Sequence, residues 1–304
     1  MIAEISGLIG RYAVRPGQLD GLKLRKVNKI KTIQSSLAIE GNTLSIGQVT
    51  DILDGRKVVA PLREIQEVRN AISAYDLFDC LDPFSIKDLL KAHGVMMAAL
   101  IDDPGKFRSG GVGVFKGSQA LHVAPPASRV PHLMQELFDW LKHAEDHLLI
   151  RSCVFHYEFE FIHPFADGNG RMGRLWQSLI LAKLHPVFQI LPVETMVRNN
   201  QQRYYAAINE CSAITNAGPF IDFMLNEILR ALNQHRGEEI GAVNGAKNRI
   251  LQYVSESPGC RANMIASALG LPLRTVQRYL EQLKKQAQIE FRGASRNGGY
   301  FPKR

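Results

Sequence analysis

Hydrophobic residues recur at intervals of three and four positions along most of the chain, and this spacing predicts amphipathic helices. In REIQEVRNAISAYDLFDCL (63–81), Ile65 and Val68 fall near one face of a helix, with charged residues opposite. SRVPHLMQELFDWLKHA (128–144) shows the same spacing, and Ser128 is placed to cap its first turn. RYYAAINECSAI and GPFIDFMLNEILRALNQH predict two further helices, separated by TNAG. We therefore expect a mainly α fold.

Two stretches depart from the helical spacing. PGKFRSGGVGVFKGSQALHVAPPASRVP (104–131) has alternating residues, many glycines and a stop at Pro125 and Pro126, so it predicts a β-hairpin or flap. HRGEEIGAVNGAKN (235–248) is polar and contains three glycines. We therefore place the linker between domains in this stretch or in a helix leading out of it.

The C-terminal segment falls into short pieces with clear ends. Helices are expected at 248–256, at 262–269 before Gly270, and at 272–286. IEFRG and GGYFP, joined by ASRN, predict a β-hairpin after the third helix. This order of helices and hairpin resembles a winged helix-turn-helix domain.

Composition sets the broad class of the protein. Of 304 residues, 45% are apolar and 22% are charged, which is ordinary for a globular protein. No run reaches the roughly 18 apolar residues of a membrane helix, and MIAEISGLIGRY at the N-terminus lacks the basic start and apolar run of a signal peptide. Four scattered cysteines without a CxxC pair favour reduced thiols over a zinc site. We expect a cytoplasmic protein with no membrane partner.

The net charge is concentrated at one end of the chain. Residues 247–304 contain 11 Lys and Arg against three Glu, which accounts for the whole formal net charge of +8. Such an excess favours contact with nucleic-acid phosphates. The side chains available to a groove on the third helix, or lying on or near the hairpin, are Arg274, Gln277, Arg278, Lys284, Lys285, Arg292 and Arg296. Winged helices also dock proteins, so DNA binding and protein docking both stay open.

The stretch FIHPFADGNGRMGRLWQSLIL (161–181) places charges and glycines between two apolar segments. Pro164 ends regular structure, and the glycines of GNG allow backbone angles that other residues avoid. The amides of 168–170 would then lie at the start of a helix beginning near Arg171. Such a helix start binds anions, because its free N–H groups and its dipole favour negative charge. Arg171 and Arg174 lie three residues apart on one helical face and add two guanidinium groups for phosphate oxygens.

Two further side chains in this stretch suggest a reaction. Asp167 would repel a bare anion, so it predicts a bridging cation, and Mg²⁺ is often held by one carboxylate and nucleotide phosphates. His163 can take a proton from an attacking hydroxyl. DGNG alone is usually a turn, and a single histidine is usually structural. Their joint occurrence with two phased arginines favours metal-assisted transfer of a phosphate-containing group from a nucleotide.

HPFADGNGRMGR resembles the signature of the Fic family, HPFx[DE]GNGRxxR, and every specified position matches. The resemblance covers residues 30–235 and implies a helical core with a flap at 112–123, which aligns a target protein's backbone by strand addition. It also implies that His163 is the general base and Asp167 the Mg²⁺ ligand. The implied anion site and phosphate ligands are Gly168, Asn169, Gly170, Arg171 and Arg174.

SSLAIEGN (35–42) is similar to the inhibitory motif [ST]xxxE[GN] of many Fic proteins, with Ser36, Glu40 and Gly41 at the specified positions. A glutamate beside the anion site can pair with Arg174, whose guanidinium would otherwise hold the γ-phosphate of ATP. ATP would then bind in a pose unsuited to attack on its α-phosphorus. A solvated helix end before Gly41 would show the same letters.

The resemblance implies a protein adenylyltransferase that transfers AMP from ATP to a hydroxyl side chain and is held inactive by its N-terminal helix. Tyr204 and Tyr205 would either stack against adenine or pack in the core. Two alternatives stay open. One is removal of AMP from modified proteins, with Glu40 orienting a water. The other is a transcriptional regulator that only senses nucleotide, against which the intact His163 argues.

The expected fold class is mainly α, with a helical Fic core, a β-hairpin flap and a C-terminal winged helix-turn-helix domain. The predicted parts are an N-terminal region with the inhibitory helix (1–60), the Fic core (61–235), a linker (236–247) and the winged-helix domain (248–304). The expected partners are ATP, Mg²⁺ and a target protein, with DNA and a second copy of the chain as further candidates. The target, its modified residue and the true nucleotide donor do not follow from the sequence.

Overall fold

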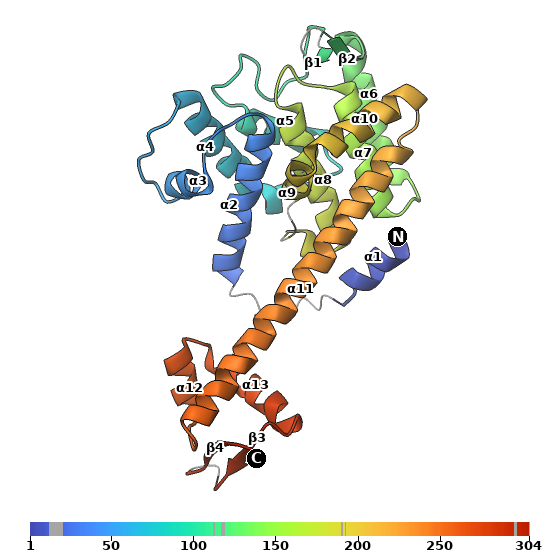
Figure 1. The fold of residues 1–304 in the computed structure, drawn as a ribbon. Helices are drawn as coiled ribbons and strands as arrows, with labels where there is room; N and C mark the ends of the chain where they lie inside the picture. The colour runs from blue at the N-terminus through green and yellow to red at the C-terminus, as the bar shows by residue number, and fades with distance from the viewer. Residues whose placement is uncertain are drawn as a thin grey trace. The chain divides into compact units, whose positions relative to one another are not determined.

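The fold is that of a computed structural model, which describes residues 1–11, 21–111, 113–116, 119–189, 191, 193–294 and 297–303; residues 21–25, 113–116, 119–123 and 236–244 are described as backbone only. The described residues are mainly helical, as the spacing predicted, with two short two-stranded sheets (Figure 1). They form two compact units, Met1–Leu232 and Asn233–Arg304. None of the described helices is long and apolar enough to cross a membrane.

The first unit is mainly helical and contains two clusters of buried hydrophobic residues, together with one β-hairpin. Residues of the N-terminal region, such as Ile33 and Leu37, belong to the same core cluster as Phe155 and Trp176. The helices are α1 (Ile2–Ile9), α2 (Gly21–Ile39), α3 (Ile46–Leu53), α4 (Leu62–Asp76), η1 (Phe78–Cys80), α5 (Ile86–Met96), η2 (Ala127–Arg129), α6 (Val130–His143), α7 (Leu148–Ile162), α8 (Asn169–Leu184), η3 (Pro186–Gln189), α9 (Val193–Asn199), α10 (Gln201–Ile214) and the start of α11 (Gly218–Glu256).

Helix α8, which follows the glycine-rich loop, lies at the centre of the first unit. It packs against α2, α5, α7 and α9, and Figure 1 shows α7 and α9 beside it. Every residue from Arg171 to Leu181 is buried. Trp176 has no exposed surface, and its indole N–H donates to the carbonyl of Pro83 at 2.9 Å. Because α8 is enclosed on all sides, the position of its first turn is fixed by the core.

The glycine-rich stretch after α5 forms the predicted hairpin. Strands β1 (Gly113–Lys116) and β2 (Gln119–Val123) pair antiparallel, with Val114 opposite His122. The register shifts by a bulge directly after Val114. Bulges are common at edges and beside active sites, where they redirect a strand.

The second unit contains the C-terminal end of α11, helices α12 (Ala262–Leu269) and α13 (Leu273–Lys285), and strands β3 (Ile289–Arg292) and β4 (Gly299–Pro302). The two strands form an antiparallel hairpin. Helix α12 ends at Gly270, whose φ of 63° lies in the left-handed region that favours glycine. A separate small core holds this unit together, formed by side chains that include Ile250, Ile265, Val276, Leu280 and Leu283.

The predicted linker lies inside a helix. Helix α11 runs without a break from Gly218 to Glu256, through the polar stretch 236–247 and the predicted separate helix 248–256. The only proline in this helix is Pro219, in its first turn. Interior glycines cost only about 1 kcal/mol each relative to alanine, so they weaken a helix without ending it.

Three other boundaries differ from the sequence predictions. Ser128 lies in η2 and does not cap α6, which begins at Val130 with Pro131 in its first turn, where a missing N–H does no harm. The helix predicted over 63–81 ends at Asp76. The apolar spacing continues beyond it, but there the chain forms the separate 3-10 turn η1. Helix α8 begins two residues earlier than the predicted start near Arg171.

Candidate active site

The loop between α7 and α8 is held in a defined conformation by its own residues. His163 ends α7 with φ 49° and ψ 63°, left-handed angles that are uncommon for a residue with a side chain. Asn169 closes the loop, since its side-chain oxygen accepts from the N–H of Phe165 and its amide donates to the carbonyl of Phe165, both at 2.9 Å. The Asn169 side chain is therefore used to fix the loop.

The first turn of α8 presents backbone N–H groups. Gly168 is the residue before the helix and has φ 87°, and a Cβ at this position would lie 2.7 Å from the sulfur of Met97. Both the backbone angle and the space therefore require glycine here. The N–H of Met172 is bonded to the carbonyl of Gly168, so the amides of Asn169, Gly170 and Arg171 are left at the helix start. The N–H of Gly168 itself donates to Asp167 Oδ1 at 2.6 Å. Such amides are the donors that bind anions.

His93 packs against the loop between α7 and α8 and holds it in place. Its ring stacks on Phe165 with ring centroids 3.6 Å apart. The N–H of Gly105 donates to Nδ1 at 2.9 Å, so the ring proton is on Nε2, which lies 3.0 Å from the carbonyl of Asp167. Burial lowers the pKa of His93 to about 4, so the ring is neutral at neutral pH.

Arg108 links the loop to the hairpin. It is only 6% exposed. Its guanidinium donates to the carbonyls of His163 (2.7 Å), Gly110 (2.9 Å), Pro125 (2.5 Å) and Ile162 (3.3 Å). Gly110 and Pro125 flank the hairpin, so a single side chain connects both of its ends to the residue that ends α7.

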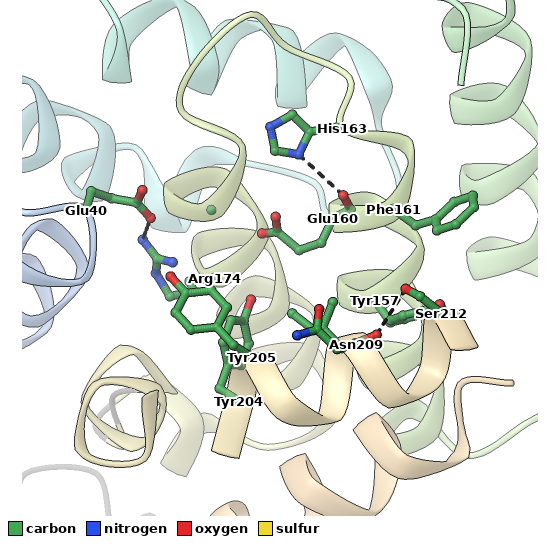
Figure 2. A pocket seen from close by; sticks show the side chains of 12 residues that line it. Glu40, Tyr157, Glu160, Phe161, His163, Arg174, Tyr204, Tyr205, Asn209 and Ser212 are labelled. Carbon is green, nitrogen blue, oxygen red and sulfur yellow. Dashed lines mark hydrogen bonds and ion pairs between the residues drawn. The ribbon is translucent and has the colours of Figure 1, made fainter. Parts of the chain in front are cut away.

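Arg174 is buried to 1% exposure and is held by the end of α2. Its Nη2 donates to Glu40 Oε1 at 2.6 Å (Figure 2). Nη2 also donates to the carbonyl of Ser36 at 3.1 Å, and Nε donates to the Ser36 hydroxyl at 3.3 Å. Burial alone would lower the pKa of Arg174, but the negative charge of Glu40 raises it above its usual value. Arg174 is therefore a permanent cation. Ser36 and Glu40, the two motif residues with side chains that can accept a hydrogen bond, both contact it.

Two glycines allow Glu40 to reach this position. Gly41 has φ 93°, so the chain can turn away directly after Glu40 at the end of α2. Gly170 faces the carboxylate: a Cβ there would lie 2.5 Å from Glu40 Oε1 and 2.9 Å from Arg174 Nη1. The second glycine of GNG is thus needed for the ion pair as well as for exposure of the helix start.

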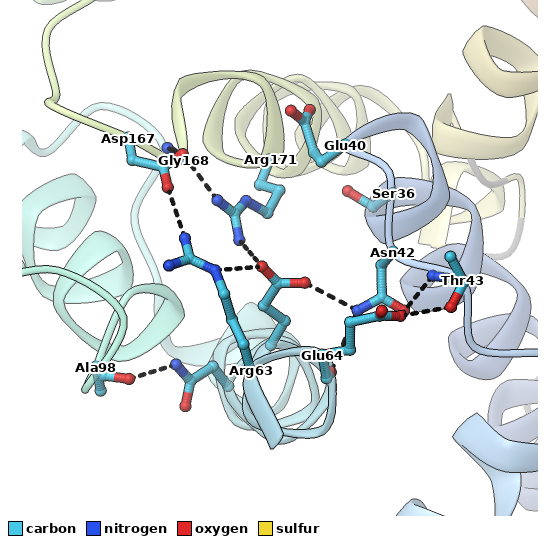
Figure 3. A network of polar contacts seen from close by, with 12 residues as sticks. Ser36, Glu40, Asn42, Thr43, Arg63, Glu64, Ala98, Asp167, Gly168 and Arg171 are labelled. Carbon is cyan, nitrogen blue, oxygen red and sulfur yellow. Dashed lines mark hydrogen bonds and ion pairs between the residues drawn. The ribbon is translucent and has the colours of Figure 1, made fainter. Parts of the chain in front are cut away.

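Asp167 and Arg171 belong to a second polar network (Figure 3). Asp167 Oδ1 accepts from Arg171 at 3.0 Å, and Oδ2 lies 3.5 Å from Arg63. Glu67 stands between the two arginines, with its Oε1 at 3.9 Å from Arg171 and 3.6 Å from Arg63. Its other oxygen accepts from Asn42 at 2.8 Å, in the turn that follows Glu40. The network therefore connects the start of α8 to the segment after α2.

A pocket lies beside the first turn of α8, with about 810 Å³ of empty space including its open mouth. Glu40, Glu160, His163, Gly170 and Arg174 line its polar part, and side chains from α7 and α10 line the rest. The pocket thus combines an imidazole, a buried guanidinium and a helix start, which together can bind an anion and accept a proton.

Comparisons with known proteins agree with this geometry. A Fic/DOC family profile matches residues 83–181, and a FaeA-like protein profile matches residues 246–299. The chain is 43% identical to a Fic family protein from Desulfovibrio desulfuricans G20 whose crystal structure is known. The alignment covers 99% of this chain and 94% of that chain, with a TM-score of 0.75. The chain belongs to the Fic family.

Curated relatives of this Fic protein are longer than it is. The protein adenylyltransferase fic-1 of Caenorhabditis elegans is 31% identical over 72% of this chain and 42% of its own length, and its Caenorhabditis briggsae counterpart is 30% identical over 76% and 44%. The chain therefore spans about two fifths of these relatives. The solved structure of Fic-1 (aa134–508) from C. elegans shares the fold at 22% identity, with a TM-score of 0.65 over 79% of this chain and 72% of that chain.

The structure brings most of the predicted site residues of this Fic protein together. His163, Gly170, Arg174 and Glu40 line one pocket, with Asp167 and Arg171 at the adjoining helix start. The two tyrosines differ. Both line the pocket, but Tyr204 is only 2% exposed, with its hydroxyl 3.0 Å from Nε2 of the buried His156, whereas Tyr205 is 44% exposed.

In the second unit the predicted basic side chains are not equivalent. Arg274, Gln277 and Lys284 are exposed on α13. Arg278 is partly buried. Its guanidinium carbon lies 4.8 Å from the centroid of the Tyr279 ring. Arg296 lies outside the described residues.

Sequence reasoning missed His93, Arg108, Glu67 and Glu160. The first three act through partners that are distant in the chain, and Glu160 is notable only because it is buried in the pocket without a donor. Arg108, for instance, follows a proline and glycine in PGKFR, but nothing local indicates that it meets the end of α7. The only available signal was its position at the base of the predicted hairpin.

We predict that Arg108→Met lowers the stability of the first unit. Carbonyl groups that Arg108 now satisfies would be left buried without a donor, at a cost of roughly 2–4 kcal/mol. Thermal unfolding followed by circular dichroism measures the effect. Arg69→Met is the matched control, because Arg69 is exposed on α4. Equal midpoints for the two variants would contradict the role assigned to Arg108.

Proposed function

We propose that this Fic protein transfers AMP from ATP to a hydroxyl side chain of a target protein. The observation that carries the proposal is that His163, the first turn of α8 and Arg174 all border the same pocket. The relatives named protein adenylyltransferase support the same reaction. A phosphate at the helix start would meet backbone N–H groups and the positive end of the helix dipole.

In the proposed reaction the target hydroxyl attacks the α-phosphorus of ATP. The new O–P bond forms as the bond to the β-phosphate oxygen breaks, and pyrophosphate leaves. His163 accepts the proton that the hydroxyl loses. Arg174 would stabilise the negative charge of the outer phosphates, which it can do only after it leaves Glu40.

Asp167 fits the proposed role of Mg²⁺ ligand. Its side chain is 42% exposed, and one carboxylate together with nucleotide phosphates is a usual ligand set for this ion. Among the described residues there is no cluster of three or more acidic, histidine or cysteine side chains that would hold a metal without a nucleotide. Bound there, Mg²⁺ would neutralise charge on the phosphates. Arg171 would then exchange its contact with Asp167 for a phosphate oxygen.

We further propose that Glu40 inhibits transfer. The carboxylate occupies Arg174 at 2.6 Å and lies directly against Gly170. An ATP whose γ-phosphate cannot reach Arg174 would bind with its α-phosphorus out of line for attack. Removal of AMP from a modified protein is the second candidate, because the same carboxylate borders the pocket and could orient a water. A purely nucleotide-sensing regulator would have no use for His163.

For the second unit we propose a winged-helix fold that binds polyanions such as duplex DNA. Helices α12 and α13 followed by the β3–β4 hairpin support this assignment, as does the FaeA-like match over 246–299. Arg274 and Lys284 are exposed on α13 and can reach phosphates. Docking of a protein is the alternative for this unit. A cytoplasmic location and a homodimer stay predictions of the sequence.

We predict that His163→Ala in a Glu40→Gly background lowers AMP transfer by about 10²–10⁴-fold, because the general base is lost. Nucleotide affinity should stay nearly unchanged, since the helix start and Arg174 remain. Transfer is measured with labelled ATP and lysate, and affinity by calorimetry. The exposed His132→Ala is the control. Full transfer activity in the His163 variant would contradict the mechanism.

We predict that Glu40→Gly raises self-modification or target modification with Mg·ATP, because Arg174 becomes available to the γ-phosphate. Glu40→Gln, which keeps the hydrogen bond but loses the charge, should give a smaller increase. Adding Arg174→Ala should remove the gain. A fall in transfer for Glu40→Gly, with release of AMP from modified protein by the wild type, would favour the hydrolase instead.

We predict that the full-length double variant Arg274→Ala, Lys284→Ala binds duplex DNA more weakly than wild type, with a shallower salt dependence. Lys142→Ala with Lys183→Ala, two changes in the first unit, is the charge-matched control. Sequence-specific binding requires a preference on the order of 10³ or more over random duplex at fixed salt. Unchanged affinity in the α13 variant would support protein docking by this unit.

A further inference from the structure

The pocket contains one carboxyl group that has no donor from the protein. Glu160 lies on α7, and its side chain is 14% exposed. Its Oε1 has almost no exposed surface and makes no hydrogen bond with any described residue, so a ligand donor reaches this oxygen only if the carboxyl group rotates toward the pocket that Glu160 lines. Burial raises the pKa of Glu160 to about 7, with Arg174 opposing the shift and Glu40 adding to it. An unsatisfied buried acceptor is costly and is uncommon outside functional sites.

His156 does not satisfy Glu160, although it is close. Its Nδ1 is 2.6 Å from Gln177 Oε1 and so carries the ring proton. Its Nε2 then accepts from the hydroxyl of Tyr204, 3.0 Å away. The distance from Nε2 to Glu160 Oε1 is 3.8 Å, too long for a hydrogen bond. Burial lowers the pKa of His156 to about 4, so the ring is neutral and has no proton to offer Glu160.

The position of Glu160 indicates which part of a ligand it meets. Its Oε1 covers Gly173, where a Cβ would lie only 2.8 Å away. Gly173 lies three residues after Gly170, a rise of about 4.5 Å along the helix. Figure 2 shows Glu160 between the Glu40–Arg174 pair and the end of the pocket formed by Tyr157, Asn209 and Ser212. It thus lies between the phosphate end and the end left for a base.

We propose that Glu160 accepts a hydrogen bond from a ribose hydroxyl of the bound nucleotide and thereby selects ribonucleotides over deoxyribonucleotides. The proposal rests on the nucleotide site proposed above. A sugar attached to a phosphate at Gly170 would lie beside the next residues of α8, where Glu160 covers Gly173. A hydrogen bond to a charged acceptor is stronger than one to a neutral acceptor, so loss of the hydroxyl should be costly.

The test measures binding of ADP, 2′-deoxy-ADP and 3′-deoxy-ADP with Mg²⁺ to the full-length Glu40→Gly protein. Calorimetry at pH 8 keeps Glu160 ionised, and diphosphates avoid transfer. We expect ADP to bind about tenfold or more tightly than at least one deoxy analogue. In Glu160→Leu the affinities should agree within about twofold, and in Glu160→Gln the preference should be intermediate. Glu158→Leu, two residues away on α7 and outside the pocket lining, should keep the parent preference.

The outcomes separate this proposal from the proposed function. Equal affinity of the parent for all three diphosphates, or an undiminished preference in Glu160→Leu, would overturn the role of Glu160 while leaving nucleotide binding intact. Failure of the parent to bind any diphosphate would overturn the nucleotide site itself. Glu160→Leu should also unfold at the same or a higher temperature than the parent, because it removes a buried carboxyl without a partner.

Discussion

The guanidinium of Arg174 has almost no contact with solvent, and a buried cation must be paired with acceptors. In this structure Ser36 and Glu40 provide them. A ligand that takes Arg174 must therefore offer a replacement negative charge, and a phosphate does so. Gly41 and Gly170 follow from the same requirement, since one lets the chain turn after Glu40 and the other leaves space for its carboxylate.

The ion pair between Arg174 and Glu40 can affect ligand binding at the start of α8 only because this helix start is held in a fixed position. The helix is enclosed by α2, α5, α7 and α9, and the preceding loop is held by Asn169, His93 and Arg108. These contacts satisfy backbone groups of the loop, so the exposed amides and His163 keep a defined position. Preorganisation of this kind is what lets donors act on a developing charge without rearranging. The Glu67 network extends the same rigidity to the turn after Glu40.

The sequence alone predicted those parts of the candidate site whose residues are close together in the chain. The residues from His163 to Arg174 are contiguous, so their spacing alone predicted a glycine-rich helix start with two arginines on one face. The hairpin was predicted for the same reason. His93 and Arg108 were missed because their partners come from other elements, and Glu160 was missed because only the folded chain places it in the pocket. Ser128 was misassigned because proline suits the first turn of α6. The continuous α11 shows that polar residues and glycines do not by themselves end a helix.

We propose that Glu40 and a nucleotide γ-phosphate compete for Arg174. Crystal structures of the wild type and of Glu40→Gly, each with Mg²⁺ and a non-hydrolysable ATP analogue, would show whether they do. In the variant the γ-phosphate should lie within hydrogen-bond distance of Arg174, whereas in the wild type Arg174 should keep Glu40 and the γ-phosphate should lie elsewhere. A wild-type complex in which Arg174 binds the γ-phosphate while Glu40 remains in place would contradict the claim.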